Sequence, residues 1–285
     1  MAAAPPGHYH SIMRDALNPP PAAAAAADAV FEILPGEADA GLILLCDHAS
    51  NHVPEEYGSL GLLPAEFERH IAYDIGAEAL TRALAARFNV PAVLSHFSRL
   101  LIDPNRGLDD PTLIMRLSDG AVIPGNARID GAERERRIAR FYRPYDDAVN
   151  RTIEAGMASG RIPMVLSIHS FTPLWKGRPR PWQVGILWDA DPRLARPLIE
   201  GLARDPAILV GDNEPYHGAL KGDTLYRHAT KRGLAHALVE IRQDLIADAD
   251  GVAQWADRLA GVLTDLRIGD APHQVEFFGS LADSP

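Results

Sequence analysis

The sequence predicts an α/β protein built on a largely parallel sheet that helices cover on both faces. Short apolar runs alternate along the chain with longer segments whose apolar residues recur at helical spacing. Strands separated by helices of about ten or more residues pair in parallel, and parallel sheets are buried on both sides. At 285 residues, 47% of them hydrophobic and 23% charged, the chain has the length and composition of a globular protein with a sizeable core.

The first expected elements lie in the N-terminal third of the chain. Residues 42–46, LILLC, are an uninterrupted apolar run, which predicts a buried strand. Residues 65–88 follow Pro64 and carry apolar residues three and four positions apart, which predicts a helix. Residues 92–102 are apolar again and predict one or two further strands.

The rest of the chain repeats this alternation. Residues 133–157 predict a long helix, in which Pro144 marks a kink or a joint because proline has no N–H for the helical hydrogen bond. The remaining expected elements are strands at 163–170, 182–189 and 235–241 and helices at 191–204 and 251–268.

The N-terminal segment differs in composition from the rest. Residues 1–28 are rich in Ala and Pro, which predicts an arm outside a single α/β domain formed by residues 29–285. The start lacks the basic and apolar regions of a signal peptide, and no stretch approaches the roughly 18 apolar residues of a membrane-spanning helix. We therefore expect a soluble cytoplasmic protein without membrane contacts. Its oligomeric state stays open, a homo-oligomer included.

Charge and cysteine content narrow the partners and the chemistry. A net charge of −10 argues against a nucleic-acid partner, which needs a basic face. It does not argue against a small acidic substrate, because local arginines outweigh a global charge. Cys46 is the single cysteine and lies in an apolar run, so we expect an inert core thiol and no thiolate metal cluster.

Polar residues end four of the apolar runs. Because functional groups of parallel α/β sheets gather beyond the carboxyl ends of the strands, we expect these residues to share one site. They are His48 after the first run, Asn105 and Arg106 after the second, His169 in the third, and Glu240 and Arg242 in the last.

Two histidines from different strands suit a catalytic zinc site when a carboxylate joins them. Such a site takes about three protein ligands and keeps a position for water. With His48 and His169 as candidates, nitrogen and oxygen are the expected ligand atoms, and these also serve other divalent ions. His52 stands four residues after His48, but we expect it in a turn because Pro54 follows closely.

The third ligand is a choice between Asn51 and Asp74. An amide oxygen is a poor substitute for a carboxylate on zinc. Asp74 lies in the expected helix between Ile71 and Ile75, whose apolar face places it near the core, where a carboxylate needs a partner. We therefore expect Asp74 to be the ligand, with Asn51 as the alternative.

Three arginines stand at or near strand ends rather than on helix surfaces. Arg99, Arg106 and Arg242 are each candidates for binding a substrate carboxylate, because a guanidinium group matches it with two parallel hydrogen bonds. The alternative is a salt bridge to a neighbour such as Asp103 or Asp244. We expect substrate binding by Arg106 and Arg242 first and by Arg99 second.

Nucleophilic and nucleotide-binding alternatives have little support. Ser170 follows His169, but the chain has no GxSxG elbow that would present a serine. It also has no Walker loop and no GxGxxG fingerprint.

Six stretches of the chain together resemble the N-formylglutamate amidohydrolase family. They are DHASNHVP, RHIAYDIGA, SRLLIDPNR, LSIHSFTP, DNEPY and LVEIRQDLI, and the similarity runs from about residue 40 to residue 268. The resemblance implies a three-layer α/β/α fold like that of the zinc carboxypeptidases and aspartoacylases. It also implies a single zinc ion and hydrolysis of the amide bond of an N-acyl amino acid.

The resemblance also implies a role for each matching residue. His48 and His169 match the first and last metal ligands, but the carboxylate expected three residues after the first is Asn51 here, which again directs attention to Asp74. The other matches concern substrate and catalysis: Asn105 and Arg106 match a pair that holds the substrate carboxylate, and Glu240 matches the general base.

N-formylglutamate is the substrate that we expect first. Zinc, with Arg106 or Arg242, would stabilise the oxyanion. Tyr216 and His217, in the loop DNEPYHG, are expected either to close over the substrate or to be structural. The alternatives are a carboxypeptidase-like or aspartoacylase-like hydrolase of another acidic N-acyl amino acid or peptide, and a non-catalytic protein that binds an acidic metabolite.

Overall fold

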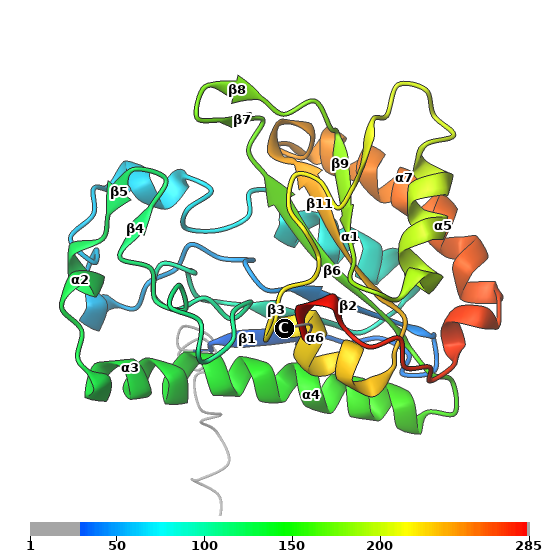
Figure 1. Ribbon diagram of the computed structural model, residues 1–285, viewed down its shortest axis with the longest axis horizontal. Helices are drawn as coiled ribbons and strands as arrows, with labels where there is room; N and C mark the ends of the chain where they lie inside the picture. The colour runs from blue at the N-terminus through cyan, green and yellow to red at the C-terminus, as the bar shows by residue number, and fades with distance from the viewer. Residues whose placement is uncertain (1–28, 284–285) are drawn as a thin grey trace, which may run out of the picture.

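A seven-stranded mixed sheet forms the centre of the molecule (Figure 1). The computed structural model describes residues 29–283, so the arm expected at residues 1–28 lies outside the described residues. In spatial order the strands are β1 (Phe31–Leu34), β3 (Ala92–Ser95), β2 (Leu42–Cys46), β6 (Met164–Phe171), β11 (His236–Arg242), β9 (Val184–Leu187) and β10 (Val210–Asp212). The predicted α/β class with a mostly parallel mixed sheet is confirmed.

Four neighbouring strands run parallel and carry the candidate site. They are β3, β2, β6 and β11. The antiparallel pairings involve β1, which pairs with β3, and β9, which pairs with β11. Every residue of β2 and β6 is buried, as expected for central strands covered on both faces.

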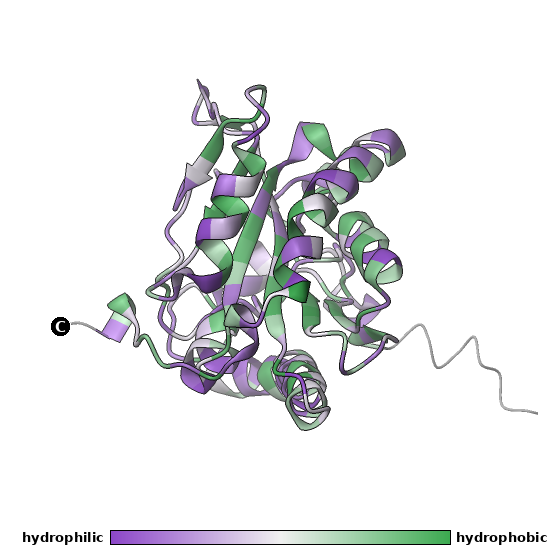
Figure 2. Cartoon of the chain, turned by 90° about the vertical axis from the view of Figure 1, so that its right-hand side faces the viewer, coloured by the Kyte–Doolittle hydropathy of each residue, from purple (hydrophilic) through white to green (hydrophobic). Residues whose placement is uncertain are grey.

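Helices cover both faces of this sheet. One face packs against α1 (Ala77–Phe88), α5 (Pro192–Leu202) and α7 (Ala249–Ile268), and the other packs against α4 (Arg143–Ala158). The two hydrophobic clusters on either side of the sheet therefore make a three-layer arrangement. Figure 2 shows the strands between the helix layers as mostly hydrophobic.

The helix expected at 65–88 begins only at Ala77. Residues Pro64–Glu68 form a short 3-10 turn, and the chain then turns until Gly76, which has a left-handed φ of 80°. A Cβ atom at Gly76 would lie 2.2 Å from the carbonyl oxygen of Ile246, so a distant segment imposes this turn. Asp74 consequently lies in the turn before α1 and not within a helix.

Two other expected elements also differ in extent. Only Ala92–Ser95 of the segment 92–102 is a strand, because the backbone then turns and the Ser98 N–H donates to the His52 carbonyl (2.7 Å). The expected long helix is divided into α3 (Gly131–Arg137) and α4 by a π-helical turn at Ile138–Tyr142. This turn directly precedes Pro144, which cannot donate a helical hydrogen bond.

Several short elements were not predicted, and three of them, the two hairpins and α6, contribute residues to the candidate site. Beyond the edge strands β1 and β10, they are the hairpins β4 (Leu117–Ser118) with β5 (Ala121–Val122) and β7 (Leu174–Trp175) with β8 (Arg178–Pro179), and the helices α2 (Pro124–Ala127) and α6 (Thr224–His228). No helix within residues 29–283 has the length and apolar character needed to cross a membrane.

Candidate metal centre and active-site cavity

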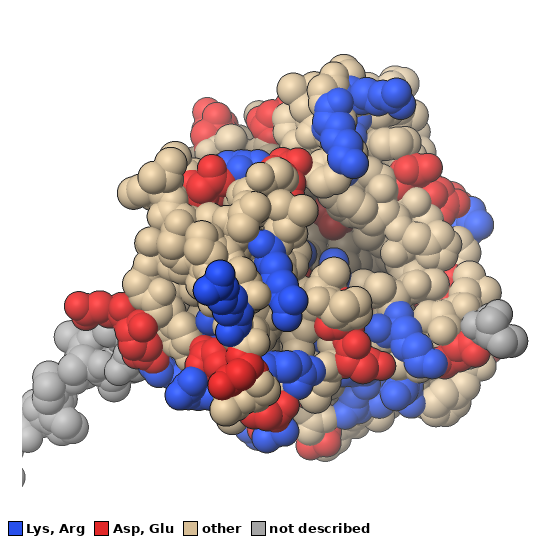
Figure 3. All heavy atoms as spheres, turned by 60° about the vertical axis from the view of Figure 1, so that its left-hand side comes forward, with Lys and Arg blue, Asp and Glu red and all other residues tan. Residues whose placement is uncertain are grey.

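A cavity of about 260 Å³ opens beside the carboxyl ends of the central strands. Figure 3 shows the corresponding face hollowed near its centre, with Lys and Arg side chains close to the opening. The lining includes residues expected from the sequence, among them His48, Asp74, Asn105, Arg106, His169 and Glu240. Residues from five separate segments of the chain therefore converge on one site.

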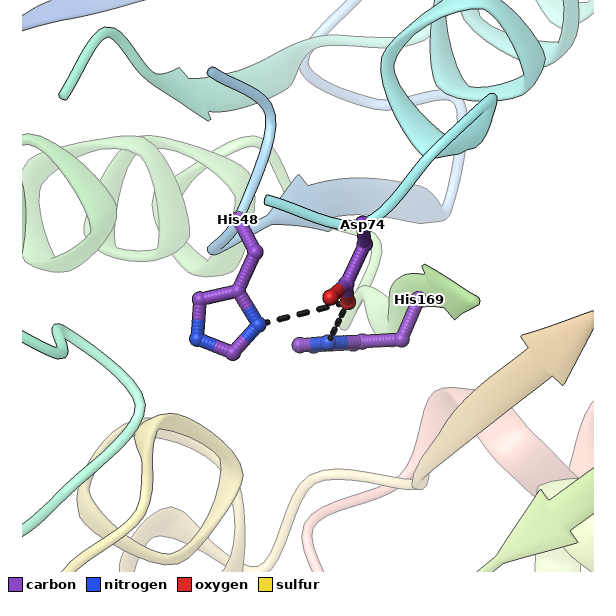
Figure 4. Close-up of side chains that lie close together, drawn as sticks. All are labelled: His48, Asp74 and His169. Carbon is purple, nitrogen blue, oxygen red and sulfur yellow. Dashed lines mark hydrogen bonds and ion pairs between the residues drawn. The ribbon is translucent and has the colours of Figure 1, made fainter. Parts of the chain in front are cut away.

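His48, Asp74 and His169 form the innermost group of this site (Figure 4). The Asp74 Oδ2 atom lies 3.2 Å from His48 Nδ1 and 2.7 Å from His169 Nδ1. One ligand atom from each residue lies within 4.8 Å of the others, and all three side chains are buried. Two imidazoles and one carboxylate in this arrangement are a suitable ligand set for a divalent metal ion.

Each of the three residues is positioned by the local backbone. His48 lies in the turn that follows β2, and His169 lies within β6, the next strand of the sheet. The Asp74 N–H donates to the His48 carbonyl oxygen (2.9 Å), which fixes the turn before α1 against the turn after β2.

A second carboxylate holds the far side of each imidazole ring. Asp103 Oδ1 lies 2.8 Å from His48 Nε2, and Asp47 Oδ2 lies 3.2 Å from His169 Nε2. In a neutral ring, a carboxylate at Nε2 favours the tautomer with its proton there, which leaves Nδ1 free to bind a metal ion at the shared site. This pattern is typical of histidines that bind metal ions and provides a further reason why the residues fit one.

Asp47 is held by four side-chain hydrogen bonds. Its Oδ1 accepts hydrogen bonds from Tyr145 (2.9 Å) and Thr224 (2.8 Å), and its Oδ2 from Ser167 (3.0 Å) as well as from His169. Burial alone would raise its pKa, but the contacts with His169 and Thr224 lower the pKa of Asp47 to about 2. Asp47 therefore stays ionised and ties β2 to β6, α4 and α6.

The pKa values within the central group reflect this pairing of opposite charges. Burial disfavours the charged form of His169, but hydrogen bonds to Asp47 and Asp74 outweigh it and raise the pKa of His169 to about 10. For Asp74, burial is likewise outweighed by the two histidines, and its pKa lies below the usual range. These carboxylates provide the negative charge that a divalent cation needs at a buried site.

Glu240 lies beside the central group on β11. It is buried, and its Oε2 atom has no hydrogen-bond partner among the described residues. Burial is the main reason why the pKa of Glu240 is raised to about 7. A carboxyl group with an unpaired oxygen and a pKa near neutrality has the properties of a general acid–base group.

Asn105 and Arg106 line the cavity next to the central group. The Asn105 side-chain oxygen accepts a hydrogen bond from the Thr224 N–H (3.0 Å), which leaves its amide N–H groups as donors. The Arg106 guanidinium donates to the Asn105 carbonyl (2.9 Å) and to Thr112 (3.3 Å). Both side chains therefore offer hydrogen-bond donors at the cavity wall.

The other two arginines are paired with carboxylates. Arg99 lines the cavity, but its Nη2 atom lies 2.8 Å from Asp103 Oδ2. Its charge is therefore paired with the carboxylate that contacts His48. Arg242 does not line the cavity: its Nε and Nη2 atoms donate to the two oxygens of Asp244 (2.7 and 3.1 Å). Both arginines thus form the salt bridges that were the alternative to substrate binding, and Arg242, which lies outside the cavity lining, is not a candidate substrate ligand.

The remaining candidates are placed as follows. Tyr216 and His217 both line the cavity. The Asn51 side chain donates to the Phe67 carbonyl (2.9 Å) and does not reach the cavity, so Asp74 is the carboxylate in the central group. His52 is exposed and outside any helix or strand, as expected of a turn residue.

Sequence reasoning missed Asp47 and the role of Asp103. Asp47 directly precedes His48 at the end of an apolar run, a position that marks it as a strand-end carboxylate. Asp103 was considered only as an arginine partner, whereas it contacts both Arg99 and His48. Nothing in the local sequence indicates that Asp103 contacts Nε2 of His48 or that Asp47 contacts Nε2 of His169.

The polar groups at this sheet edge form a candidate catalytic site of an α/β protein. A family model described as N-formylglutamate amidohydrolase matches residues 40–247, more than half of the chain. The chain belongs to the N-formylglutamate amidohydrolase family, and its general activity is that of an amidohydrolase.

Two of the solved structures that match the chain are similar to it over most of its length. The crystal structure of gene product Atu2144 from Agrobacterium tumefaciens is 36% identical, with a TM-score of 0.78 over 85% of this chain and 98% of the other. N-formylglutamate amidohydrolase from Ralstonia eutropha JMP134 is 26% identical, with a TM-score of 0.60 over 84% of this chain and 97% of the other. Among curated proteins no match was found.

Proposed function

We propose that this protein uses a bound zinc ion to hydrolyse the amide bond of an N-formyl amino acid, N-formylglutamate in particular. The observation that carries the proposal is Glu240, whose buried and unpaired oxygen lies beside the group formed by His48, Asp74 and His169. The family membership of the chain and its similarity to the Ralstonia N-formylglutamate amidohydrolase support the choice of substrate.

His48 and His169 would hold the ion through Nδ1 and Asp74 through a carboxylate oxygen. A zinc ion supplies Lewis-acid chemistry there, polarising the substrate carbonyl and lowering the pKa of water to about 7. Asp103 and Asp47 keep the two imidazoles in the required orientation by accepting from Nε2.

Glu240 would act as the general base and then as the general acid. Its carboxylate takes a proton from the attacking water and passes a proton to the leaving amine of the amino acid. A pKa of about 7, which results mainly from burial, suits both steps because the group gains and loses a proton readily near neutral pH.

Asn105 and Arg106 would hold the carboxylate of the amino acid. Their free N–H groups line the cavity next to the central group, and a guanidinium group matches a carboxylate with two parallel hydrogen bonds. Holding this carboxylate in place also positions the amide bond of the substrate relative to Glu240.

Release of glutamate and formate from N-formylglutamate tests the proposal. The protein is assayed as purified, after chelator treatment, and after addition of zinc, with N-acetylglutamate and N-formylleucine as comparison substrates. We expect activity that chelator abolishes and zinc restores. Hydrolysis that resists removal of all metal would contradict the metal role, and a preference for the acetyl compound would contradict the assigned acyl group.

A further inference from the structure

Arg180 is a buried cation for which the structure shows no anionic partner. Its side chain is only 8% exposed, and within residues 29–283 no carboxylate forms an ion pair with it. Its hydrogen bonds go to two neutral oxygens, the Tyr216 hydroxyl (3.0 Å) and the Thr172 carbonyl (3.4 Å). A buried charge without a counterion is unfavourable, so a nearby anion would stabilise it.

The other arginines near the site differ in this respect. Arg99 lies 2.8 Å from Asp103, Arg242 is bound by Asp244, and Arg106 Nε lies 4.0 Å from Asp110. Arg180 is thus a buried cation beside the site whose charge no carboxylate of the described residues balances through an ion pair.

Three aromatic rings lie against the Arg180 guanidinium. The Cζ atom lies 4.9 Å from the ring centre of Tyr216, 5.1 Å from that of Trp175 and 5.7 Å from that of Phe171. All three aromatic residues line the cavity that also holds Glu240. The positive charge therefore lies directly behind the cavity wall, held there by cation–π contacts.

The hydrogen bond between Arg180 and Tyr216 fixes the direction of the phenol proton. A guanidinium group can only donate, so the Tyr216 oxygen accepts from Arg180 and its own proton remains to be donated elsewhere. Within the described residues the Tyr216 hydroxyl donates to no protein acceptor, and the side chain lines the cavity. A hydroxyl polarised by a cation is a suitable donor to an anionic oxygen.

We propose that Arg180 and Tyr216 together recognise the side-chain carboxylate of an acidic N-acyl amino acid. This inference rests on the proposed function, in which Asn105 and Arg106 hold the other carboxylate of the same substrate. Tyr216 contacts the side-chain carboxylate directly, and Arg180 is a positioning residue that orients the phenol and contributes its charge from behind the wall.

Binding of two matched compounds tests this assignment. N-formylglutamate and N-formylglutamine differ only in the side-chain carboxylate, and titration calorimetry measures the dissociation constant of each for the zinc-loaded E240Q protein, in which turnover is suppressed. Into this protein we introduce Y216F, R180M and the pair. We expect each change to weaken N-formylglutamate binding roughly tenfold and N-formylglutamine binding less than about twofold, and the pair to add little because both act through one hydrogen bond.

R178M is the matched control. It removes the same charge from the same hairpin, but Arg178 is exposed and does not line the cavity. Thermal unfolding of each variant identifies loss of folding, and Y216F keeps the test valid if R180M unfolds, since it deletes a single oxygen from a partly exposed ring.

The outcomes separate this inference from the proposed function. The carboxylate assignment would be overturned if the substitutions weakened binding of both compounds equally, or if R178M had as large an effect as R180M. It would also be overturned if the E240Q protein bound both compounds with equal affinity or bound neither. Selective weakening without any hydrolysis by the unmodified protein would leave the carboxylate site in place and overturn the reaction instead.

Discussion

Glu240 and His169 are direct neighbours across the parallel strands β11 and β6. Residues paired in this way on adjacent strands present their side chains on the same face of the sheet. Both side chains line the cavity, so the register of two strands, and not a flexible loop, places the carboxylate beside the metal-binding group. The position of the expected general base is therefore fixed as rigidly as the sheet itself.

Replacement of Glu240 by Gln should lower kcat by about 100- to 10,000-fold, because the amide cannot take up a proton. Zinc content should stay near that of the unmodified protein, since Glu240 is not part of the group that would hold the ion. Steady-state kinetics and metal analysis check both expectations, with E154Q on the exposed surface of α4 as the control. Activity within a few-fold of the unmodified protein would contradict the general-base role.

Replacement of Asp47 by Asn should weaken zinc binding by about 10- to 100-fold, because the amide no longer orients and polarises His169 through its Nε2 atom. A chelator competition assay measures the zinc dissociation constant, and D265N on the exposed side of α7 is the control. Thermal unfolding of both variants separates the effect from a loss of stability. An unchanged zinc affinity would show that Asp47 holds the fold alone.

Replacement of Arg106 by Lys should raise KM for N-formylglutamate by roughly tenfold, because an ammonium group cannot form the two parallel hydrogen bonds of a guanidinium. The same change at Arg242 should have little effect, since Arg242 is bound to Asp244 and lies outside the cavity. Initial rates over a range of substrate concentrations distinguish the two. A larger effect at Arg242 would reverse the assignment.

Replacement of Asp146 by Asn should lower the free energy of unfolding by about 1–2 kcal/mol at pH 7. Burial alone would raise the pKa of Asp146, but its contacts with His228 (2.6 Å) and Arg227 (3.0 Å) outweigh it and lower the pKa. A lowered carboxyl pKa stabilises the fold above the unfolded value of about 3.9, and this stabilisation is lost as the pH falls through the folded value.

The difference between the D146N and unmodified proteins should therefore shrink as the pH falls below about 4. Urea unfolding at pH 7, 5, 4 and 3 follows it. D147N is the control, because the neighbouring Asp147 is exposed. A difference that stayed constant over this range would mean that the charge of Asp146 is not the source of the stability.

Residues on strands or directly after them were the most predictable part of the site. His48, His169 and Glu240 lie at or near the ends of apolar runs in the sequence. The topology of a parallel sheet brings such positions to one edge. Asp74 was also expected in the site but was assigned to a helix. Its turn depends on the left-handed Gly76, which Ile246 constrains from a distant segment, and no periodicity within the segment reports such a contact.

The arginines show where sequence reasoning failed and why. Arg242 ends an apolar run just as Glu240 does, yet Asp244, two residues on, binds its guanidinium. Arg180 follows a two-residue strand in a hairpin and carries no pattern of its own. Its surroundings come from side chains distant in the sequence, such as Tyr216, so its role depends on tertiary structure.

The distribution of the site over the sheet has a consequence for engineering. The groups expected to perform the chemistry lie on or directly beside three adjacent central strands, β2, β6 and β11, whereas Arg180 and Tyr216 lie in connections near the rim. Such connections accept changes in length and composition more readily than buried strands do. Loop grafting at the β7–β8 hairpin and at residues 213–218 should therefore redirect this scaffold toward other N-acyl amino acids while its hydrolytic centre stays intact.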